Sequence, residues 1–283
     1  MIDWLTEPWQ YEFFRRGILA ATMAGALTGL IGIYVVLRRM SYIGHGLSHA
    51  ILGGTVVGYL ANYNFYAIGA IWGAISALMV TGLARTRKIG ADAAIGIVTT
   101  ASYAIGVALI SQGNHFTRNF EAAFFGNILG VTSGEVWVLA AVSVAVAITL
   151  FFLYKQLLFV TFDVEVAATY GVRTEVVDIV FALVLAAAII ATMRILGVTL
   201  IAAAIVTPAV VARLSTDSFG RMLALSTAVG ALSGFVGMYV SYHLDIASGA
   251  TITLTGAAVF AVVYVVGAAR GVRRGRGLRL SAR

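Results

Sequence analysis

The sequence predicts an all-α membrane protein, a polytopic bundle of transmembrane helices. Hydrophobic residues make up 60% of the 283 positions and charged residues only 11%, whereas soluble domains carry about 25% charged residues. Apolar segments recur along the chain between short polar connections, and about 20 apolar residues suffice to cross a bilayer. This composition excludes a water-soluble globule. We therefore expect a single integral-membrane domain over residues 1–283.

Nine apolar segments are candidate crossings, with eight as the alternative count. The stretch from Val176 to Leu214 would be about 58 Å long as one helix, too long for a hydrocarbon core of about 30 Å. We divide it at the turn from Arg194 to Gly197. The nine segments are residues 17–37, 46–61, 65–84, 91–110, 136–154, 176–193, 196–214, 222–243 and 250–269.

The distribution of basic residues predicts that the N-terminus lies outside and the C-terminus inside. Cytoplasmic loops of membrane proteins are enriched in Lys and Arg. Residues 1–16 then form an outer segment, and residues 270–283 form a basic cytoplasmic tail beside anionic lipid. Lipid accounts for the net charge of +7, so we expect no nucleic acid as a partner. Of the 19 basic residues, the outer side holds only Arg15, Arg16, Arg118 and Arg194.

Two connections are too long to be simple turns. On the outer side, residues 121–132 are largely apolar but too few to cross, which predicts a re-entrant or interfacial helix. On the inner side, residues 155–175 include Asp163 and Gly171. An Asp before a short apolar run and a Gly after it are the start and stop signals of a helix. We therefore expect a short cytoplasmic helix between these two residues.

Two of the four histidines, His45 and His49, are four positions apart in one apolar segment. On a helix this spacing places both side chains on one face, beside Ser48. Two imidazoles so placed can bind one divalent cation. The alternative is a packing role, but two histidines on one face of a lipid-embedded helix are costly without a shared purpose. We predict a metal or ion site at this pair.

For each of the other polar residues near the predicted helix ends, the sequence allows two interpretations of its role. Asp92 is a possible further metal ligand, or a carboxylate favoured at a helix start by the helix dipole. Asp178 is close enough to the inner interface to reach water or to cap its helix. His243 and Asp245 flank an outer turn and form either a further metal site at the rim or a solvated loop.

Several absent motifs narrow the function. The chain has no cysteine, so any metal site must use His, Asp, Glu or backbone oxygen. It has no Gly-Lys dipeptide, hence no P-loop and no ATP hydrolysis of its own. A His-Glu-x-x-His zinc-protease motif is also absent. We therefore do not expect an enzyme.

The run Arg38–Gly54, RRMSYIGHGLSHAILGG, closely resembles the signature of permease subunits of ABC importers for zinc, manganese and iron. Further blocks resemble the same family, in the family's order, so that the resemblance extends over about residues 17–269. Each block alone is a weak signal, but together they are specific. These blocks are residues 92–96, 125–129, 162–167, 207–213 and 245–252.

The resemblance implies a permease that pairs with a second copy and sits on cytoplasmic ATP-binding subunits. It also implies that an extracytoplasmic metal-binding protein delivers the cargo, Zn²⁺ or Mn²⁺, and that no cofactor is bound permanently. Residues 155–175 would then be the coupling loop, with Asp163, Glu165 and Gly171 in the helix that docks on the ATPase.

The sequence departs from the family at His45, where relatives commonly have Asp, while His49 matches a family histidine. Zinc-type members often have a His near Thr100, which is not a comparable ligand here. An imidazole pair suits zinc better than manganese, so zinc is the favoured cargo. The alternative function is a secondary metal transporter or channel with a carboxylate relay at mid-membrane. Most carboxylates of this chain lie near predicted helix ends, which disfavours it.

Overall fold

The computed structural model describes residues 6–86, 89–113, 124–126 and 128–280, and it leaves the side chains of residues 129 and 270–280 undescribed. The described part is all helical. Its elements are η1 (Glu7–Gln10), α2 (Glu12–Leu37), α3 (Ile43–Leu60), α4 (Phe65–Ala84), α5 (Ala91–Gly113), η2 (Ile128–Gly130), α7 (Ser133–Phe152), α8 (Tyr154–Phe162), α9 (Val164–Thr169), α10 (Thr174–Leu196), α11 (Ile201–Ser215), α12 (Phe219–Leu244) and α13 (Ser248–Leu280).

Each of the nine predicted segments overlaps mainly with one helix, but segment 136–154 runs past the end of α7 and segment 196–214 begins before α11. Within the described residues, seven helices are long and apolar enough to cross a membrane: α2, α4, α5, α7, α10, α12 and the Ser248–Ala269 part of α13. The other two are α3, which has 18 residues and carries both histidines, and α11, which has 15 residues. Nine crossings therefore remain a prediction that depends on these two shorter helices.

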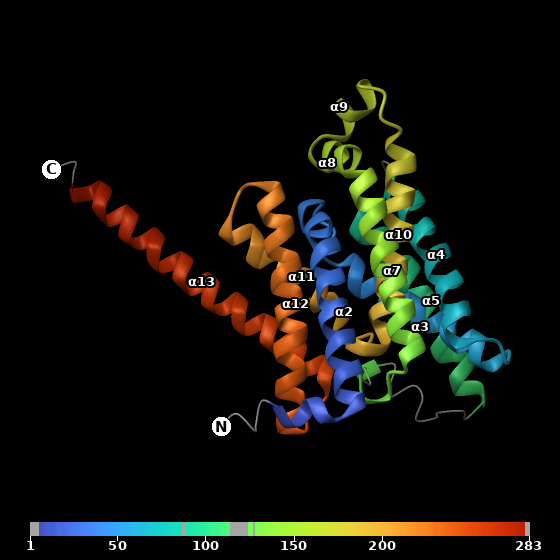
Figure 1. Ribbon diagram of the computed structural model, residues 1–283. Coiled ribbons are helices and arrows are strands. Elements are labelled where there is room, and N and C mark those ends of the chain that lie inside the picture. The colour runs from blue at the N-terminus through green and yellow to red at the C-terminus, as the bar shows by residue number, and fades with distance from the viewer. Residues whose placement is uncertain (1–5, 87–88, 114–123, 127, 281–283) are drawn as a thin grey trace.

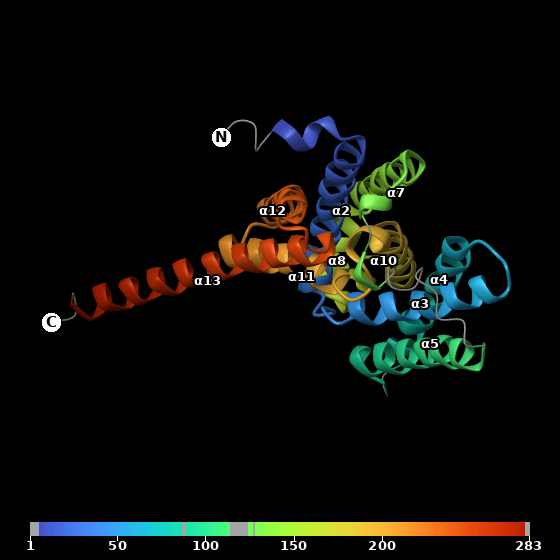
Figure 2. The same ribbon diagram turned by 90° about the horizontal axis from the view of Figure 1, so that it is seen from below.

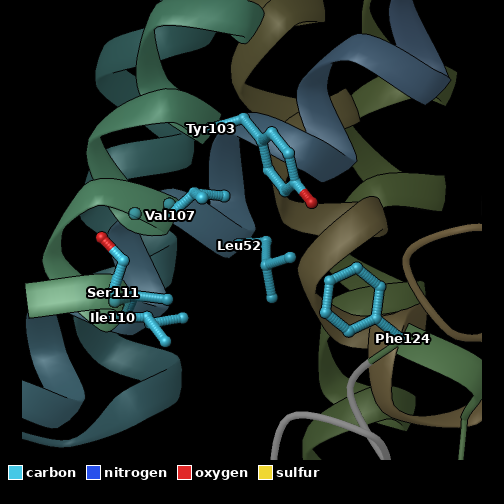
Figure 3. A pocket seen from close by; sticks show the side chains of 9 residues that line it. Leu52, Tyr103, Val107, Ile110, Ser111 and Phe124 are labelled. Atoms are coloured by element: carbon cyan, nitrogen blue, oxygen red, sulfur yellow. The ribbon is translucent and has the colours of Figure 1, made fainter. Parts of the chain in front are cut away.

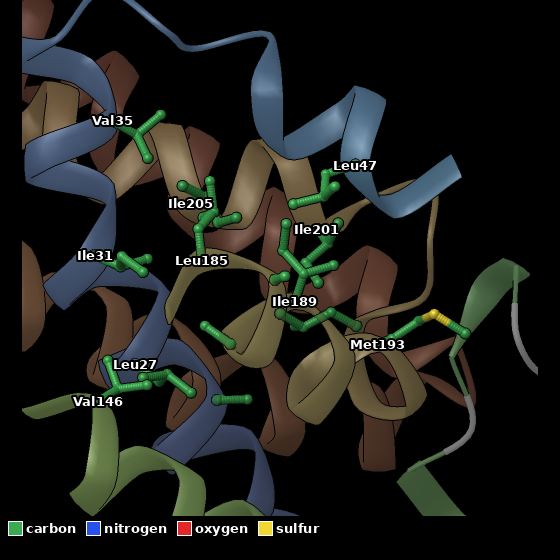
Figure 4. Packing of buried hydrophobic residues seen from close by; sticks show 14 of the residues in the cluster. Leu27, Ile31, Val35, Leu47, Val146, Leu185, Ile189, Met193, Ile201 and Ile205 are labelled. Atoms are coloured by element: carbon green, nitrogen blue, oxygen red, sulfur yellow. The ribbon is translucent and has the colours of Figure 1, made fainter. Parts of the chain in front are cut away.

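The helices pack around α10 and α11, with α2, α12 and α13 on one side and α3, α4 and α5 on the other (Figures 1 and 2). At the centre, Leu27 and Ile31 of α2 lie among the buried side chains of α10 and α11, including Leu185, Ile189 and Ile205 (Figure 4). Large apolar side chains are exposed on the peripheral helices, as expected where the solvent is lipid. Examples are Trp137, Phe151 and Leu254.

Two stripes of small residues hold α2 and α12 together. A Cβ atom at Gly25 would collide with the backbone of Gly230, and one at Gly29 would collide with the backbone of Ser226. The Ser226 hydroxyl donates a hydrogen bond to the Gly29 carbonyl over 2.6 Å. Small residues spaced four apart allow such backbone contact between membrane helices. Glycine is therefore required at this crossing for reasons of space.

The predicted break between α10 and α11 is confirmed. Helix α10 ends at Leu196, and Gly197 has a φ of 77°, a left-handed conformation that favours glycine. A Cβ atom at Gly197 would also collide with the backbone of Phe124 and Phe125. The Thr199 hydroxyl donates to the Phe124 carbonyl over 2.8 Å. The described end of the outer segment is thus docked on the α10–α11 link.

The predicted outer helix over residues 121–132 lies partly outside the described residues, since residues 114–123 and 127 are not described. The described remainder contains the 3-10 helix η2. Beyond it, Thr132 caps α7 in a capping box with Glu135.

The predicted inner segment forms two helices where the sequence predicted one. Helix α9 matches the prediction: the Asp163 carboxylate accepts a hydrogen bond from the Val166 amide over 2.9 Å, and Gly171 has a φ of 80°. Helix α8 precedes it, separated from α7 at Leu153, where no Gly or Pro signals a boundary. Figure 1 shows α8 and α9 at the end of the bundle opposite η1.

Candidate metal site

The α2–α3 connection determines where His45 lies. Arg39 adopts a left-handed conformation with a φ of 56°. The Met40 amide donates to the Val35 carbonyl over 3.0 Å, and the Ile43 amide donates to the Met40 carbonyl over 2.8 Å. These bonds close a tight turn over residues 38–42. Helix α3 therefore begins at once, with His45 in its first turn.

His45 and His49 share one face of α3, as their spacing predicts. Their ring centroids are 4.5 Å apart, with an angle of 75° between the ring planes. Both side chains are half-buried. Among the described residues, Nδ1 of His49 is buried without a hydrogen-bond partner. An imidazole nitrogen that is free of hydrogen bonds is available as a metal donor.

Ser48 anchors this part of α3. Its side chain is fully buried, and its hydroxyl lies 2.8 Å from the His45 carbonyl and 3.0 Å from the Val198 carbonyl. The second contact ties α3 to the α10–α11 link. The histidine pair is therefore held against the central helices.

Glycines bring α3 close to α5. A Cβ atom at Gly46 would come within 2.8 Å of side-chain atoms of Ile95 and Thr99, and one at Gly53 would collide with the backbone of Ser102. As a result, Tyr103 of α5 contacts His49, with ring centroids 5.1 Å apart at 75°. The sequence analysis did not identify Tyr103, because only the tertiary packing brings it to the pair.

A cavity of about 270 Å³ lies between α3 and α5, beside Tyr103. Its walls are mainly apolar and include Leu52, Val107 and Phe124 (Figure 3). Leu52 lies about one turn beyond His49 in α3, so the cavity adjoins the histidine pair on the side of the predicted outer end. Tyr103 contacts His49 and also lines the cavity.

The structure does not bring the other candidate ligands to the pair. Asp92 is exposed in the first turn of α5. His243 packs against Tyr242, with ring centroids 5.1 Å apart, and Asp245 is the exposed C-cap of α12 with a φ of 52°. In the described parts of the chain, no group of three or more His, Cys, Asp or Glu side chains is placed to hold a metal ion. Of the candidate ligands named from the sequence, the structure brings only His45 and His49 together.

Helix α9 carries an exposed apolar surface at the end of the bundle opposite η1. Val164, Val166 and Tyr170 are 51%, 40% and 77% exposed. Glu165 is also exposed. Exposed apolar side chains that cluster in this way indicate a contact surface.

Seven helices of the described residues are long and apolar enough to cross a membrane, and they define a multi-pass integral protein of the cell membrane with a polytopic helical permease fold. The profile of the ABC 3 transport family matches residues 10–267. The chain belongs to this family.

Curated relatives cover nearly the whole chain. It is 31% identical over 263 residues to the manganese transport system membrane protein MntC of Listeria monocytogenes, covering 93% of this chain and 94% of that protein. It is 34% identical over 266 residues to a Haemophilus influenzae protein named as a probable iron transport system membrane protein, covering 93% and 96%. Among solved structures, PsaBC from Streptococcus pneumoniae in complex with Fab superimposes with a TM-score of 0.83 and 28% identity, covering 93% of this chain and 95% of that chain.

Proposed function

We propose that the chain is the membrane-spanning permease subunit of an ABC importer of a divalent transition metal. Separate cytoplasmic subunits hydrolyse ATP, because this chain has no P-loop. An extracytoplasmic metal-binding protein delivers the ion. Membership of the ABC 3 transport family supports this function, as do relatives named for manganese and iron transport.

The histidine pair is the observation that carries the proposal. Two rings 4.5 Å apart in a helix of a membrane bundle are expensive in hydrocarbon unless they serve an ion. Nδ1 of His49 has no hydrogen-bond partner among the described residues, which leaves it available for coordination. The metal ion is the transported substrate, so it binds at the histidine pair only briefly on its way across the membrane. A sparse ligand set suits this role, because conduction requires binding weak enough for release.

A second copy of the chain completes the coordination. Zinc in proteins usually has four ligands, whereas one chain offers His45 and His49. Two copies related by a twofold axis would supply four imidazoles at their interface. Homodimers with such symmetry are the commonest oligomers. The permease therefore acts as a pair of identical chains.

Donor chemistry favours zinc as the cargo. Imidazole suits zinc, whereas carboxylate and water suit manganese, and His45 and His49 are both imidazoles. The names of the relatives favour manganese or iron instead. Manganese and iron are therefore the alternative cargoes, and an uptake assay with each metal distinguishes them from zinc.

The orientation is N-terminus outside and C-terminus inside. It places α8 and α9 in the cytoplasm, within a coupling loop at residues 155–175. The exposed apolar side chains of α9 then meet the ATPase, with Asp163 and Gly171 bounding that helix and Glu165 on its surface. The whole chain is one permease domain, with an outer segment at residues 1–16 and a basic tail at residues 270–283.

The second candidate function is a secondary transporter or channel driven by protons or by the membrane potential. Such proteins carry a relay of carboxylates at mid-membrane. In the described helices that span the membrane, the acidic residues lie within two turns of a helix end. They are Glu12, Asp92, Glu135, Glu175 and Asp178. Their position favours the ATP-driven importer.

Uptake of radioactive zinc, manganese and iron into proteoliposomes tests the proposal. The vesicles contain the permease, its ATPase and the binding protein. We expect uptake only with ATP, and loss of at least tenfold in His45→Ala and in His49→Ala, because removing one ligand of a sparse site weakens binding by about this factor or more. His243→Ala is the matched control and retains uptake. Uptake without ATP, or normal uptake in the double variant, would contradict the proposal.

A further inference from the structure

The guanidinium of Arg38 joins three helices at the inner end of the bundle. Arg38 is the C-cap of α2. Its Nε donates to the Thr161 hydroxyl of α8 over 3.1 Å, and one terminal nitrogen donates to the Asp178 carboxylate of α10 over 3.0 Å. The guanidinium carbon lies 4.5 Å from the centre of the Phe181 ring. A single side chain thus connects α2, α8 and α10.

This junction is buried and shared with a second arginine. The side chain of Arg38 is only 9% exposed. The other Asp178 oxygen lies 3.6 Å from Nε of Arg85, the C-cap of α4. Burial lowers the pKa of Arg38 while Asp178 opposes that shift, and arginine stays charged in proteins. Removing a partner from a buried charge is strongly unfavourable, so Arg38 and Asp178 move together.

Arg38 is also connected to the histidine pair through the backbone. Residues 38–42 form the hydrogen-bonded turn that leads into α3, so only seven positions separate Arg38 from His45. On the other side, Thr161 is two positions before Asp163, the N-cap of α9. The contact from Thr161 to Arg38 therefore gives a short path from the coupling helix to the first histidine.

We propose that Arg38 is a positioning residue that transmits movement of α8 and α9 to the turn carrying His45. This inference rests on the proposed function, because it takes α9 to be the part driven by the ATPase. When α8 shifts, the Thr161 hydroxyl pulls on Nε of Arg38, while Asp178 keeps the guanidinium attached to α10. The α2–α3 turn then rotates against α10 and changes the position of the histidine rings.

A change at Thr161 tests the link without disturbing the ion pair. Thr161→Val removes the acceptor for Nε but preserves side-chain volume and leaves Arg38 beside Asp178. Thr161→Ser retains the hydroxyl and is the matched control. In proteoliposomes with the complete transporter, we expect metal uptake per ATP hydrolysed to fall about tenfold in Thr161→Val relative to Thr161→Ser, because a hydrogen bond to a charged group is lost. A purely structural role would lower uptake and hydrolysis together and leave this ratio unchanged, which would overturn the inference.

A second measurement needs neither metal nor ATP. The chain contains no cysteine, so spin labels attach only at Ala168→Cys, in the last turn of α9, and at Tyr42→Cys, next to His45. We expect a broader distance distribution between the labels in Thr161→Val than in Thr161→Ser. Identical distributions would overturn the inference. Uptake by the unmodified transporter that does not depend on ATP would instead contradict the proposed function, while the label distances would still decide the mechanical link.

Discussion

Arg194 in the last turn of α10 forms a salt bridge with Glu135 in the first turn of α7, which joins the ends of two membrane helices. Arg194 also donates to the Gly130 carbonyl over 3.1 Å, and Glu135 accepts from the Thr132 amide over 2.8 Å. The pair therefore connects η2, α7 and α10. Its side chains are 33% and 31% exposed, so water only partly screens the charges.

Glu135→Ala should lower the stability of the protein. The substitution removes both the salt bridge and the capping interaction of α7, each worth about 1 kcal/mol. Thermal unfolding in detergent measures the change. Glu12→Ala is the control, since Glu12 pairs with Arg16 on the surface and is 68% exposed. If the two substitutions lowered the unfolding temperature equally, the Arg194–Glu135 salt bridge would contribute no more to stability than an exposed surface pair.

Gly25→Ala should disrupt the packing of α2 on α12. The new methyl group would meet the Gly230 carbonyl, and overpacking of this kind costs about 1–3 kcal/mol or more. We expect less monodisperse protein in size-exclusion chromatography and a lower unfolding temperature. Gly96→Ala is the control, because a Cβ atom at Gly96 has nothing within 4 Å. Loss of folded protein in Gly96→Ala as well would point to a general intolerance of larger residues.

His45→Asp should shift the metal preference from zinc toward manganese. The substitution converts an imidazole pair into a carboxylate and an imidazole, and carboxylate oxygen suits manganese. Competition uptake, with one labelled metal and increasing amounts of the other, measures the preference. We expect the ratio of zinc to manganese uptake to fall about tenfold, equivalent to about 1.4 kcal/mol. An unchanged ratio would mean that position 45 does not contact the ion.

Glu165→Arg should uncouple ATP hydrolysis from transport. Glu165 is exposed on α9, the helix proposed to meet the ATPase. Reversing its charge would place it opposite a like charge of the partner, and like charges repel. We expect uptake to fall severalfold while the ATPase continues to turn over. Asp217→Arg makes the same charge change in the α11–α12 loop, where the carboxylate is 99% exposed, and should leave transport intact. Coupled transport in Glu165→Arg would argue against docking through this surface.

The helices could be predicted from the sequence because their signals are local. Runs of apolar residues indicate the nine segments, and Asp163 and Gly171 mark the ends of α9 by their own capping chemistry. Gly197 marks the break after α10 in the same way. Local patterns of this kind need no knowledge of the tertiary fold.

The remaining features depend on contacts between distant parts of the chain. Helix α8 separates from α7 at Leu153 without a Gly or Pro to signal it. Asp178 was predicted to cap a helix or to reach water, but it pairs with Arg38, 140 positions away. Tyr103 meets His49 only because Gly46 and its neighbours bring α3 onto α5. The spacing of the two histidines was enough to predict that they form a pair. The residues that surround the pair could be identified only from the three-dimensional structure.

Two adjacent residues of the α10–α11 link secure two different elements. The Val198 carbonyl accepts from Ser48, beside the histidines, and the Thr199 hydroxyl donates to Phe124 of the outer segment. Reorientation of a single peptide unit would therefore loosen both attachments together, at a cost of about 1 kcal/mol for each bond. The histidine-bearing helix α3 and the segment at Phe124 are therefore attached at the same peptide unit, and we expect them to detach together.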